Sequence, residues 1–300
     1  MCWFKETRTA IDPRTAIILK MPDYSLTNLY LTASIVLYHS DLKQFETVVL
    51  GLHHAFAELL ASEQRAVIYV VDQSSDDAYA KLARDVCVLE EQDHRIDVEF
   101  IVRAVNGGYG AGHNEVLKRP LGVFHLVLNP DVELSPDSTR AGFMAFQTDP
   151  RIVALGPRAF NGDGREEYLA KDYPSVLVLF LRAFAPQWLC QLFAAQLLKY
   201  ELRELPVSEA AQDVRLLSGC CMWFKTEHFA AVGGFDERYF MYFEDYDLSL
   251  RLAAGGRVVR ASGMIIIHHG GNASKKGLQH ILWFARGALR FFNQWGWKWL

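Results

Sequence analysis

Five carboxylates lie among aromatic side chains between residues 233 and 251: Asp236, Glu237, Glu244, Asp245 and Asp247. Aromatic rings lower the local dielectric, so ionised carboxylates among them need a partner, a proton or a metal ion. A carboxylate held in such a setting is suited to act as a general base. The alternative is a helix capped by Asp245 or Asp247 with ordinary ion pairs, and the segment alone leaves both interpretations open.

Three other groups of polar residues follow apolar runs that are typical of strands. They are Asp72-Gln-Ser-Ser-Asp-Asp77, the glycine-rich stretch from Asn106 to Asn114, and Asn129-Pro-Asp131. Each one alone can be explained as a helix cap or a turn. Because parallel strands end at the same edge of a sheet, the three together predict one ligand crevice.

The glycine-rich stretch is not a dinucleotide fingerprint. Gly108, Gly110 and Gly112 do not give the G-x-G-x-x-G spacing, and they follow the third predicted strand rather than the first. A glycine-rich turn that leads into a helix still lets backbone approach a phosphate or a sugar.

The elements that must position these groups alternate along the chain. The apolar patterns predict strands over 29–38, 66–71, 96–102 and 123–128, with helices over 42–60, 78–89 and 111–118. This alternation predicts a three-layer α/β fold with a mostly parallel central sheet. Further along, the patterns predict a strand over 152–157, a polar loop over 158–171, a helical region over 175–205 and a strand over 257–267.

Composition bounds the class of protein. The chain has 300 residues, 51% of them hydrophobic and 22% charged, which suits one large or two closely merged domains. A net charge of -4 gives no basic field for nucleic acid. Five cysteines without C-x-x-C spacing argue against a zinc site or a disulfide framework and favour a reducing, cytoplasmic setting. No signal peptide or membrane-spanning run is evident, since Arg182 and Pro186 interrupt the apolar stretch over 175–198.

Six pieces in this order resemble the inverting family 2 glycosyltransferases of A-type fold, and most closely their rhamnosyltransferase-like branch. The matching pieces are Val71-Asp-Gln-Ser-Ser-Asp76, Asn106 to Asn114, Leu128-Asn-Pro-Asp-Val132, Ser218-Gly-Cys-Cys-Met222, Gly233-Gly-Phe-Asp-Glu237 with Phe243-Glu-Asp-Tyr-Asp-Leu248, and His268-His-Gly-Gly271. The resemblance runs from about Leu31 to Ser274. It implies a nucleotide-diphospho-sugar transferase domain over 29–275, preceded by a leader over 1–28. Within the domain, residues 29–135 would bind the nucleotide sugar and residues 136–275 the acceptor.

The resemblance also implies a divalent cation, Mg or Mn, beside the donor. A nucleoside diphosphate gains negative charge as it leaves, and such a cation can offset that charge. Asp131 corresponds to the metal ligand of the family, and His268 to a second protein ligand. His269 is adjacent, and neighbouring residues of a strand point to opposite faces, so only one of the two is expected to bind.

Roles for the other residues follow from the same resemblance. Asp72 would contact the base, and Asn129 the ribose or the sugar. The remaining expected substrate contacts are Tyr38, Asn106, Gly107, Gly108, Asn114, Gly219 and Asp236. Asp245 corresponds to the general base, with Glu244 in support. Asp236 and Asp247 are also candidates for structural roles, as a turn former and as a helix start or partner of Arg251.

Together these roles predict a metal-dependent inverting transfer. The expected donor is dTDP-L-rhamnose and the expected acceptor is a hydroxyl of a cell-surface glycan or glycolipid, with UDP-hexose or UDP-N-acetylhexosamine as alternative donors. A nucleotidyltransferase should carry a glycine-rich loop with Arg and Lys after the first strand, where this chain has Tyr38-His-Ser-Asp41. A non-catalytic sugar-binding relative should have lost Asp131 or Asp245, and both are present.

The end of the chain, 276–300, is predicted to form an aromatic and basic helix. Trp and Phe residues are mixed there with Arg286, Arg290 and Lys298, a composition that suits peripheral contact with the inner face of the cytoplasmic membrane. The alternative is a helix that packs Trp283, Phe284 and Phe291 against the domain.

Overall fold

A computed structural model describes residues 28–88, 93–208, 210–270 and 277–300, so all but the last residue of the predicted leader lies outside the described part. Its centre is a sheet of ten strands in which β3-β2-β1-β4-β9-β6-β10-β5 are neighbours, while β7 pairs with β6 and β8 with β10. The strands are β1 Leu29–Leu37, β2 Arg65–Asp72, β3 Ile96–Val102, β4 Phe124–Leu128, β5 Val132–Leu134, β6 Ile152–Phe160, β7 Glu166–Glu167, β8 Ala211–Asp213, β9 Cys221–Lys225 and β10 Arg257–His268.

The sheet is mostly parallel. The strands β3, β2, β1 and β4 run in parallel, β9 is antiparallel to both β4 and β6, and β10 is parallel to β6. The short strands β5, β7 and β8 are antiparallel to their neighbours. The carboxyl ends of β1, β2, β4, β6 and β10 therefore lie at one edge, together with the amino end of β9.

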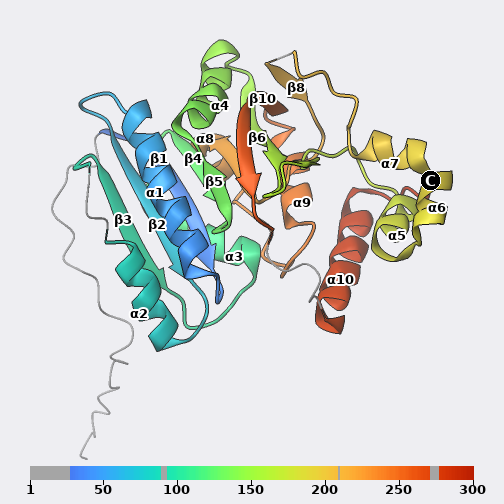
Figure 1. The fold of residues 1–300 in the computed structure, drawn as a ribbon, viewed down its shortest axis with the longest axis horizontal. Coiled ribbons are helices and arrows are strands. Elements are labelled where there is room, and N and C mark those ends of the chain that lie inside the picture. The colour runs from blue at the N-terminus through green and yellow to red at the C-terminus, as the bar shows by residue number, and fades with distance from the viewer. Residues whose placement is uncertain (1–27, 89–92, 209, 271–276) are drawn as a thin grey trace, which may run out of the picture.

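Helices cover both faces of the sheet (Figure 1). On one face lie α1 (Leu42–Leu59), α2 (Asp77–Val86) and α4 (Pro136–Thr148). On the other lie α3 (Tyr109–Asn114), α8 (Thr226–Ala231) and α9 (Glu244–Leu252). This arrangement confirms the predicted three-layer α/β fold.

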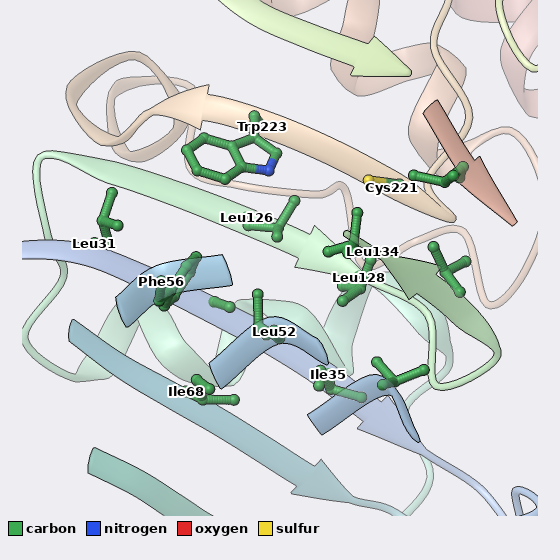
Figure 2. Packing of buried hydrophobic residues seen from close by; sticks show 14 of the residues in the cluster. Leu31, Ile35, Leu52, Phe56, Ile68, Leu126, Leu128, Leu134, Cys221 and Trp223 are labelled. Atoms are coloured by element: carbon green, nitrogen blue, oxygen red, sulfur yellow. The ribbon is translucent and has the colours of Figure 1, made fainter. Parts of the chain in front are cut away.

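The alternation of side chains along each strand explains why helices pack on both faces of the sheet. In β1, Leu31 and Ile35 pack with Leu52 and Phe56 of α1, as Figure 2 shows, and Trp223 of β9 joins the same cluster. The intervening residues of β1 point to the opposite face, because side chains of a strand alternate. Every residue of β1 from Leu31 to Leu37 is buried, which is expected of a parallel strand covered on both sides.

Side chains cap the helices that follow the strands. Asp41 accepts hydrogen bonds from the backbone N–H groups of Lys43 and Gln44 at 2.9 and 3.0 Å, which starts α1. Asp76 caps α2 in the same way, at 3.0 and 3.1 Å from Ala78 N and Tyr79 N. These caps fix where each helix begins after the preceding strand. The strand ends therefore remain at the edge of the sheet.

Several predicted elements differ from the observed ones. The helix predicted over 111–118 begins at Tyr109 and tightens to a 3-10 turn over Glu115–Lys118. The predicted polar loop over 158–171 contains the end of β6 and the strand β7, and the helix α4 lies where no element was predicted.

The predicted helical region over 175–205 is divided into α5 (Val176–Phe184), α6 (Gln187–Leu192) and α7 (Ala194–Tyr200). Pro186 lies at the first break, because proline cannot donate a backbone hydrogen bond inside a helix. Among the described cysteines, Cys87, Cys190, Cys220 and Cys221 are free thiols.

The predicted C-terminal helix is present as α10 (Leu278–Trp295). Phe291 and Phe292 are buried against Leu179 of α5 and against Tyr239 and Phe243. The packed alternative is therefore correct for this face of the helix. No helix in the described part of the chain is long and apolar enough to cross a membrane.

Candidate active site

The predicted site residues of both halves of the chain lie at the edge where the strands end. Asp72 is the last residue of β2 and is buried, whereas Tyr38 follows β1 and is 57% exposed. Asn129 follows β4, and its backbone N–H donates to the carbonyl of Cys220, just before β9, at 2.8 Å. The fold thus brings the strand-end motifs to the second half of the chain.

Asp72 shapes the turn that follows β2. Its carboxylate accepts from the backbone N–H and the hydroxyl of Ser74 at 3.0 and 2.9 Å. The adjacent Gln73, which is not among the predicted site residues, accepts from Gly107 N at 3.1 Å and donates to the carbonyl of Gly108 at 3.1 Å. Gln73 therefore ties the glycine-rich turn to the end of β2. Its position next to Asp72 in the same motif could have identified Gln73 from the sequence.

The glycine-rich turn meets the acid-aromatic segment directly. Asn106 Oδ1 accepts from Gly108 N at 2.9 Å, and Tyr109 N donates to the carbonyl of Phe240 at 3.0 Å. Gly108 has φ +92°, and a Cβ there would lie 2.1 Å from that same carbonyl oxygen. Only glycine fits this position, for both reasons.

Asn114 makes a second link between these two segments. Its Nδ2 donates to the carbonyl of Phe235 at 2.8 Å and to Glu237 Oε1 at 3.0 Å, and its Oδ1 accepts from Phe235 N at 2.8 Å. The structure thus gives Asn114 a linking role, and its direct contact with a nucleotide stays a prediction.

Asp131 and His268 lie side by side, because β5 pairs with the end of β10. His268 Nε2 is 3.7 Å from Asp131 Oδ1, and its Nδ1 is 2.7 Å from Glu167 Oε2. His269 instead directs its Nε2 to Glu133 Oε1 at 2.6 Å. The geometry therefore favours His268 over His269 as the partner of Asp131.

The donor atoms at this position fit a divalent cation that arrives with a diphosphate. No three His, Cys, Asp or Glu residues of the described part form a complete set of metal ligands. Mg²⁺ in nucleotide sites is usually held by one or two carboxylates, with phosphates and water in the other positions. Asp131 supplies one carboxylate, and His268 adds an imidazole nitrogen beside it. The contact of His268 Nδ1 with Glu167 is the arrangement typical of a ligating histidine.

The segment before α9 has an unusual backbone. Tyr242 and Phe243 have φ of 72° and 70°, a left-handed conformation that bulky residues rarely adopt. Helix α10 packs closely on it, since a Cβ at Gly287 would lie 2.8 Å from the carbonyl oxygen of Tyr242. The left-handed segment leads directly into α9, whose first two residues are Glu244 and Asp245.

In the alternative of a capped helix with ordinary ion pairs, the cap by Asp245 or Asp247 is wrong, whereas the ion pairs are present between Asp247 and Arg251 and between Asp236 and Arg238. The residue in the N-cap position of α9 is Phe243, and no side chain caps the helix there. Asp245 instead accepts from Gly219 N and Tyr246 N, both at 2.9 Å. Tyr109, which is not among the predicted site residues, donates a hydrogen bond from its hydroxyl to the carbonyl of Gly219 and so supports the same contact.

The two carboxylates differ in their setting. Glu244 is buried, and its Oε2 has no hydrogen-bond partner in the described residues, whereas Asp245 is only partly buried. Burial raises the pKa of Asp245 to about 6, and the backbone N–H donors limit the rise. Burial, together with the charge of Asp245, raises the pKa of Glu244 well above its usual range. At neutral pH the pair therefore keeps its charge on Asp245, which suits a general base.

The other three carboxylates of the segment have protein partners. Asp247 is fully buried and accepts from Arg251 at 2.7 Å, and also from Gln294 and Trp295 of α10 at 2.7 and 2.9 Å. Asp236 accepts hydrogen bonds from the guanidinium and the backbone N–H of Arg238, the arrangement expected of a turn-forming residue. Glu237 bonds to Asn114. Asp236, Glu237 and Asp247 are therefore scaffold residues, in contrast to Glu244 and Asp245.

The chain is similar to known proteins. The model of the family "Glycosyl transferase family 2" matches residues 48–232, more than half of the chain. An N-acetylglucosaminyl-diphospho-decaprenol L-rhamnosyltransferase of Mycobacterium tuberculosis is 31% identical over 224 residues, which cover 70% of this chain and 68% of that protein. Rhamnosyltransferase WbbL of Escherichia coli is 28% identical over 166 residues, or 51% of this chain and 58% of that protein.

Solved structures share the fold. GalNAc-T7 with UDP, GalNAc and Mn²⁺ aligns with a TM-score of 0.61 and 14% identity over 91% of this chain and 49% of its own length. The mannosyltransferase PcManGT from Pyrobaculum calidifontis, in complex with GDP-Man and Mn²⁺, gives a TM-score of 0.54 and 17% identity over 91% of this chain and 68% of that one. At these identities the likeness shows the fold alone.

Proposed function

This chain belongs to glycosyl transferase family 2, and we propose that it transfers L-rhamnose from dTDP-L-rhamnose to a hydroxyl of a lipid-linked glycan. The observation that carries the proposal is the position of Asp245, an ionised carboxylate of raised pKa at the edge that also carries Asp131 and His268. The rhamnosyl group and the diphosphate-linked acceptor are proposed by analogy with the mycobacterial rhamnosyltransferase.

Asp245 takes the proton of the acceptor hydroxyl as its oxygen attacks the anomeric carbon. The new glycosidic bond forms while the bond from that carbon to the diphosphate oxygen breaks, and the diphosphate leaves with the electron pair. Attack from the side opposite the leaving group inverts the anomeric centre, and no covalent enzyme intermediate is needed. Glu244, protonated next to Asp245, leaves the negative charge on the base.

Asp131 and His268 would hold a Mg²⁺ or Mn²⁺ ion, which when bound offsets the negative charge that the diphosphate gains. Glu167 orients the imidazole of His268 by its contact with Nδ1. The backbone of the glycine-rich turn, held by Gln73 and Asn106, would lie along the nucleotide, with Asp72 near the base and Asn129 near the ribose or sugar.

Peripheral membrane contact belongs to the same proposal. One side of α10 exposes Leu278, Ile281, Leu282 and Leu289, and α5 and α6 expose Phe180, Phe184 and Trp188. The chain end lies next to α5, since Val176 N donates to the carbonyl of Lys298 at 2.8 Å. Exposed aliphatic and aromatic side chains of this kind suit the membrane interface.

Removal of residues 281–300 would not test membrane contact cleanly, because Gln294 and Trp295 also bond to Asp247 of α9. A Leu278→Asp, Leu282→Asp double variant changes only exposed side chains. We expect it to bind phospholipid vesicles more weakly in a sedimentation assay. Binding equal to that of the unchanged protein would contradict the membrane proposal.

The donor is tested by thermal shift with a panel of nucleotide sugars in the presence of Mg²⁺ or Mn²⁺. A ligand that binds only the folded state raises the unfolding temperature. We expect the largest rise with dTDP-L-rhamnose. A rise with UDP-hexose or UDP-N-acetylhexosamine alone would replace the donor and leave the transferase assignment in place.

A further inference from the structure

An open groove of about 940 Å³ lies between α10 and the segment from Arg238 to Met241. We call it the arginine groove, because Arg238, Arg286 and Arg290 line it. Its other walls include Phe240 and Trp283, whose rings are 4.6 Å apart at their centroids. Of the groups discussed above as metal, donor and base residues, none lines it.

The groove carries a net positive charge. Arg238 is neutralised by Asp236, to which it makes a two-point ion pair. Arg286 and Arg290 have no carboxylate within 4.0 Å among the described residues, and Arg290 lies over the ring of Tyr239 at 5.7 Å. The hydroxyl of Tyr239 is buried and has no hydrogen-bond partner in the described part of the chain. Two guanidinium groups without a carboxylate partner among the described residues thus line the groove, one of them over the ring of Tyr239.

The chemistry of these groups selects a phosphate ligand. Guanidinium groups bind phosphate through paired, charge-assisted hydrogen bonds. Two of them side by side match the charge of a diphosphate better than that of a neutral sugar. The exposed Leu282 and Leu289 on the same helix offer an apolar surface next to the arginines. An anionic head joined to a hydrocarbon chain would satisfy both.

The groove is also close to the base. Phe240, in its wall, accepts a hydrogen bond from Tyr109 of the glycine-rich turn. Asp245 is five positions after Phe240, so their Cα atoms lie within about 18 Å even for a fully extended chain. The left-handed turn at Tyr242 and Phe243 shortens this separation further. The groove and the base thus belong to one short stretch of chain, and the acceptor sugar would have to span the distance between them.

We propose that the arginine groove binds the diphosphate of a polyprenyl-diphosphate-linked acceptor, with Arg286 and Arg290 as the phosphate ligands. This inference rests on the proposed function for the identity of the acceptor. It assigns to α10 a part in acceptor binding as well as the contact with α9.

Calorimetric titration of the full chain with farnesyl diphosphate tests the groove. EDTA in the buffer removes divalent cations, so the diphosphate cannot bind through a metal at Asp131 and His268. We expect Arg286→Gln with Arg290→Gln to weaken binding by at least about tenfold, since charge-assisted hydrogen bonds are lost. The double Arg→Lys variant keeps the charge and should bind more tightly than the Gln variant. Arg140→Gln, a change at an exposed arginine of α4, is the matched control and should bind like the unchanged protein.

Equal affinity of the unchanged protein and the double Gln variant would overturn the proposal. Vesicles of phosphatidylglycerol separate the other source of phosphate, a lipid headgroup. If the double Gln variant loses vesicle binding but keeps its affinity for farnesyl diphosphate, the groove is a headgroup site and the proposal is wrong.

Donor binding distinguishes failure of the groove from failure of the proposed function. The double Gln variant should bind dTDP-L-rhamnose with Mg²⁺ as the unchanged protein does. A chain that binds farnesyl diphosphate through these arginines but does not bind dTDP-L-rhamnose would overturn the donor and still support the groove.

Discussion

Asp245→Asn should inactivate the enzyme and stabilise its fold. The substitution keeps the shape of the side chain, and its amide oxygen can still accept from Gly219 N, which lies 2.9 Å from the carboxylate. It removes the charge that burial disfavours. Loss of a general base lowers the rate by about 10²- to 10⁴-fold, while donor binding should stay nearly unchanged.

The size of the stabilisation follows from the pKa. Asp245 titrates at about 6 in the folded protein, against about 3.9 in an unfolded chain. Because the folded pKa is the higher one, this group favours folding below about pH 4, and that contribution is lost as the pH rises through about 6. The difference of about two units corresponds to at most about 3 kcal/mol at pH 7. This is an upper bound, because Asp245 is partly accessible and Glu244 can take up charge in the variant.

Urea unfolding at about pH 4 and at about pH 7 measures the effect. We expect the variant to be more stable than the unchanged protein at pH 7 and nearly equal at pH 4. Asp137→Asn, at an exposed residue of α4, is the control and should lack this pH-dependent gain. A variant less stable at pH 7, or one that keeps its transfer activity, would refute the assignment of Asp245 as a charged base in a partly buried site.

Three other predictions concern the same site and its support. The value of kcat/KM should rise with pH through an apparent pKa of about 6 and then level off, and a profile that is flat from pH 5 to 8 would contradict the role of Asp245. In metal titrations, Asp131→Ala should remove the cation dependence of donor binding, and Glu167→Gln should weaken cation affinity by about 10- to 100-fold. Titrations unchanged in both variants would exclude a cation site at Asp131 and His268. His125 is hydrogen-bonded to Thr32 and Ser34, and burial lowers its pKa to about 3, so its stabilising contribution is lost as the pH falls below about 6.5. In urea unfolding, His125→Gln should therefore reduce the loss of stability between pH 7 and pH 5 by about 2 kcal/mol. An equal loss of stability in both proteins would refute this prediction.

Local pattern was enough to predict the fold class. The apolar runs of the first half, such as 29–38 and 66–71, have the length and composition of buried parallel strands, and short-range periodicity does not depend on partners elsewhere in the chain. The helix α4 escaped prediction, although Ser135 and Pro136 form an N-terminal signal there. The apolar region after residue 175 has helical composition throughout, so only the break at Pro186 indicated that it is divided.

The sequence by itself also determined which residue types are available for chemistry: an acid pair, strand-end carboxylates and a histidine at the end of a strand. Which of them meet was decided by the tertiary structure, because the deciding contacts join residues far apart in the chain. Asn114 bonds to Phe235, 121 residues away, and His268 lies 101 residues from Glu167. The separation of Glu244 and Asp245 from the three scaffold carboxylates depends on partners such as Arg238 and Trp295, whose proximity no local pattern encodes. Burial and hydrogen bonding, which set the pKa of Asp245, are properties of the packed chain and not of its sequence motif.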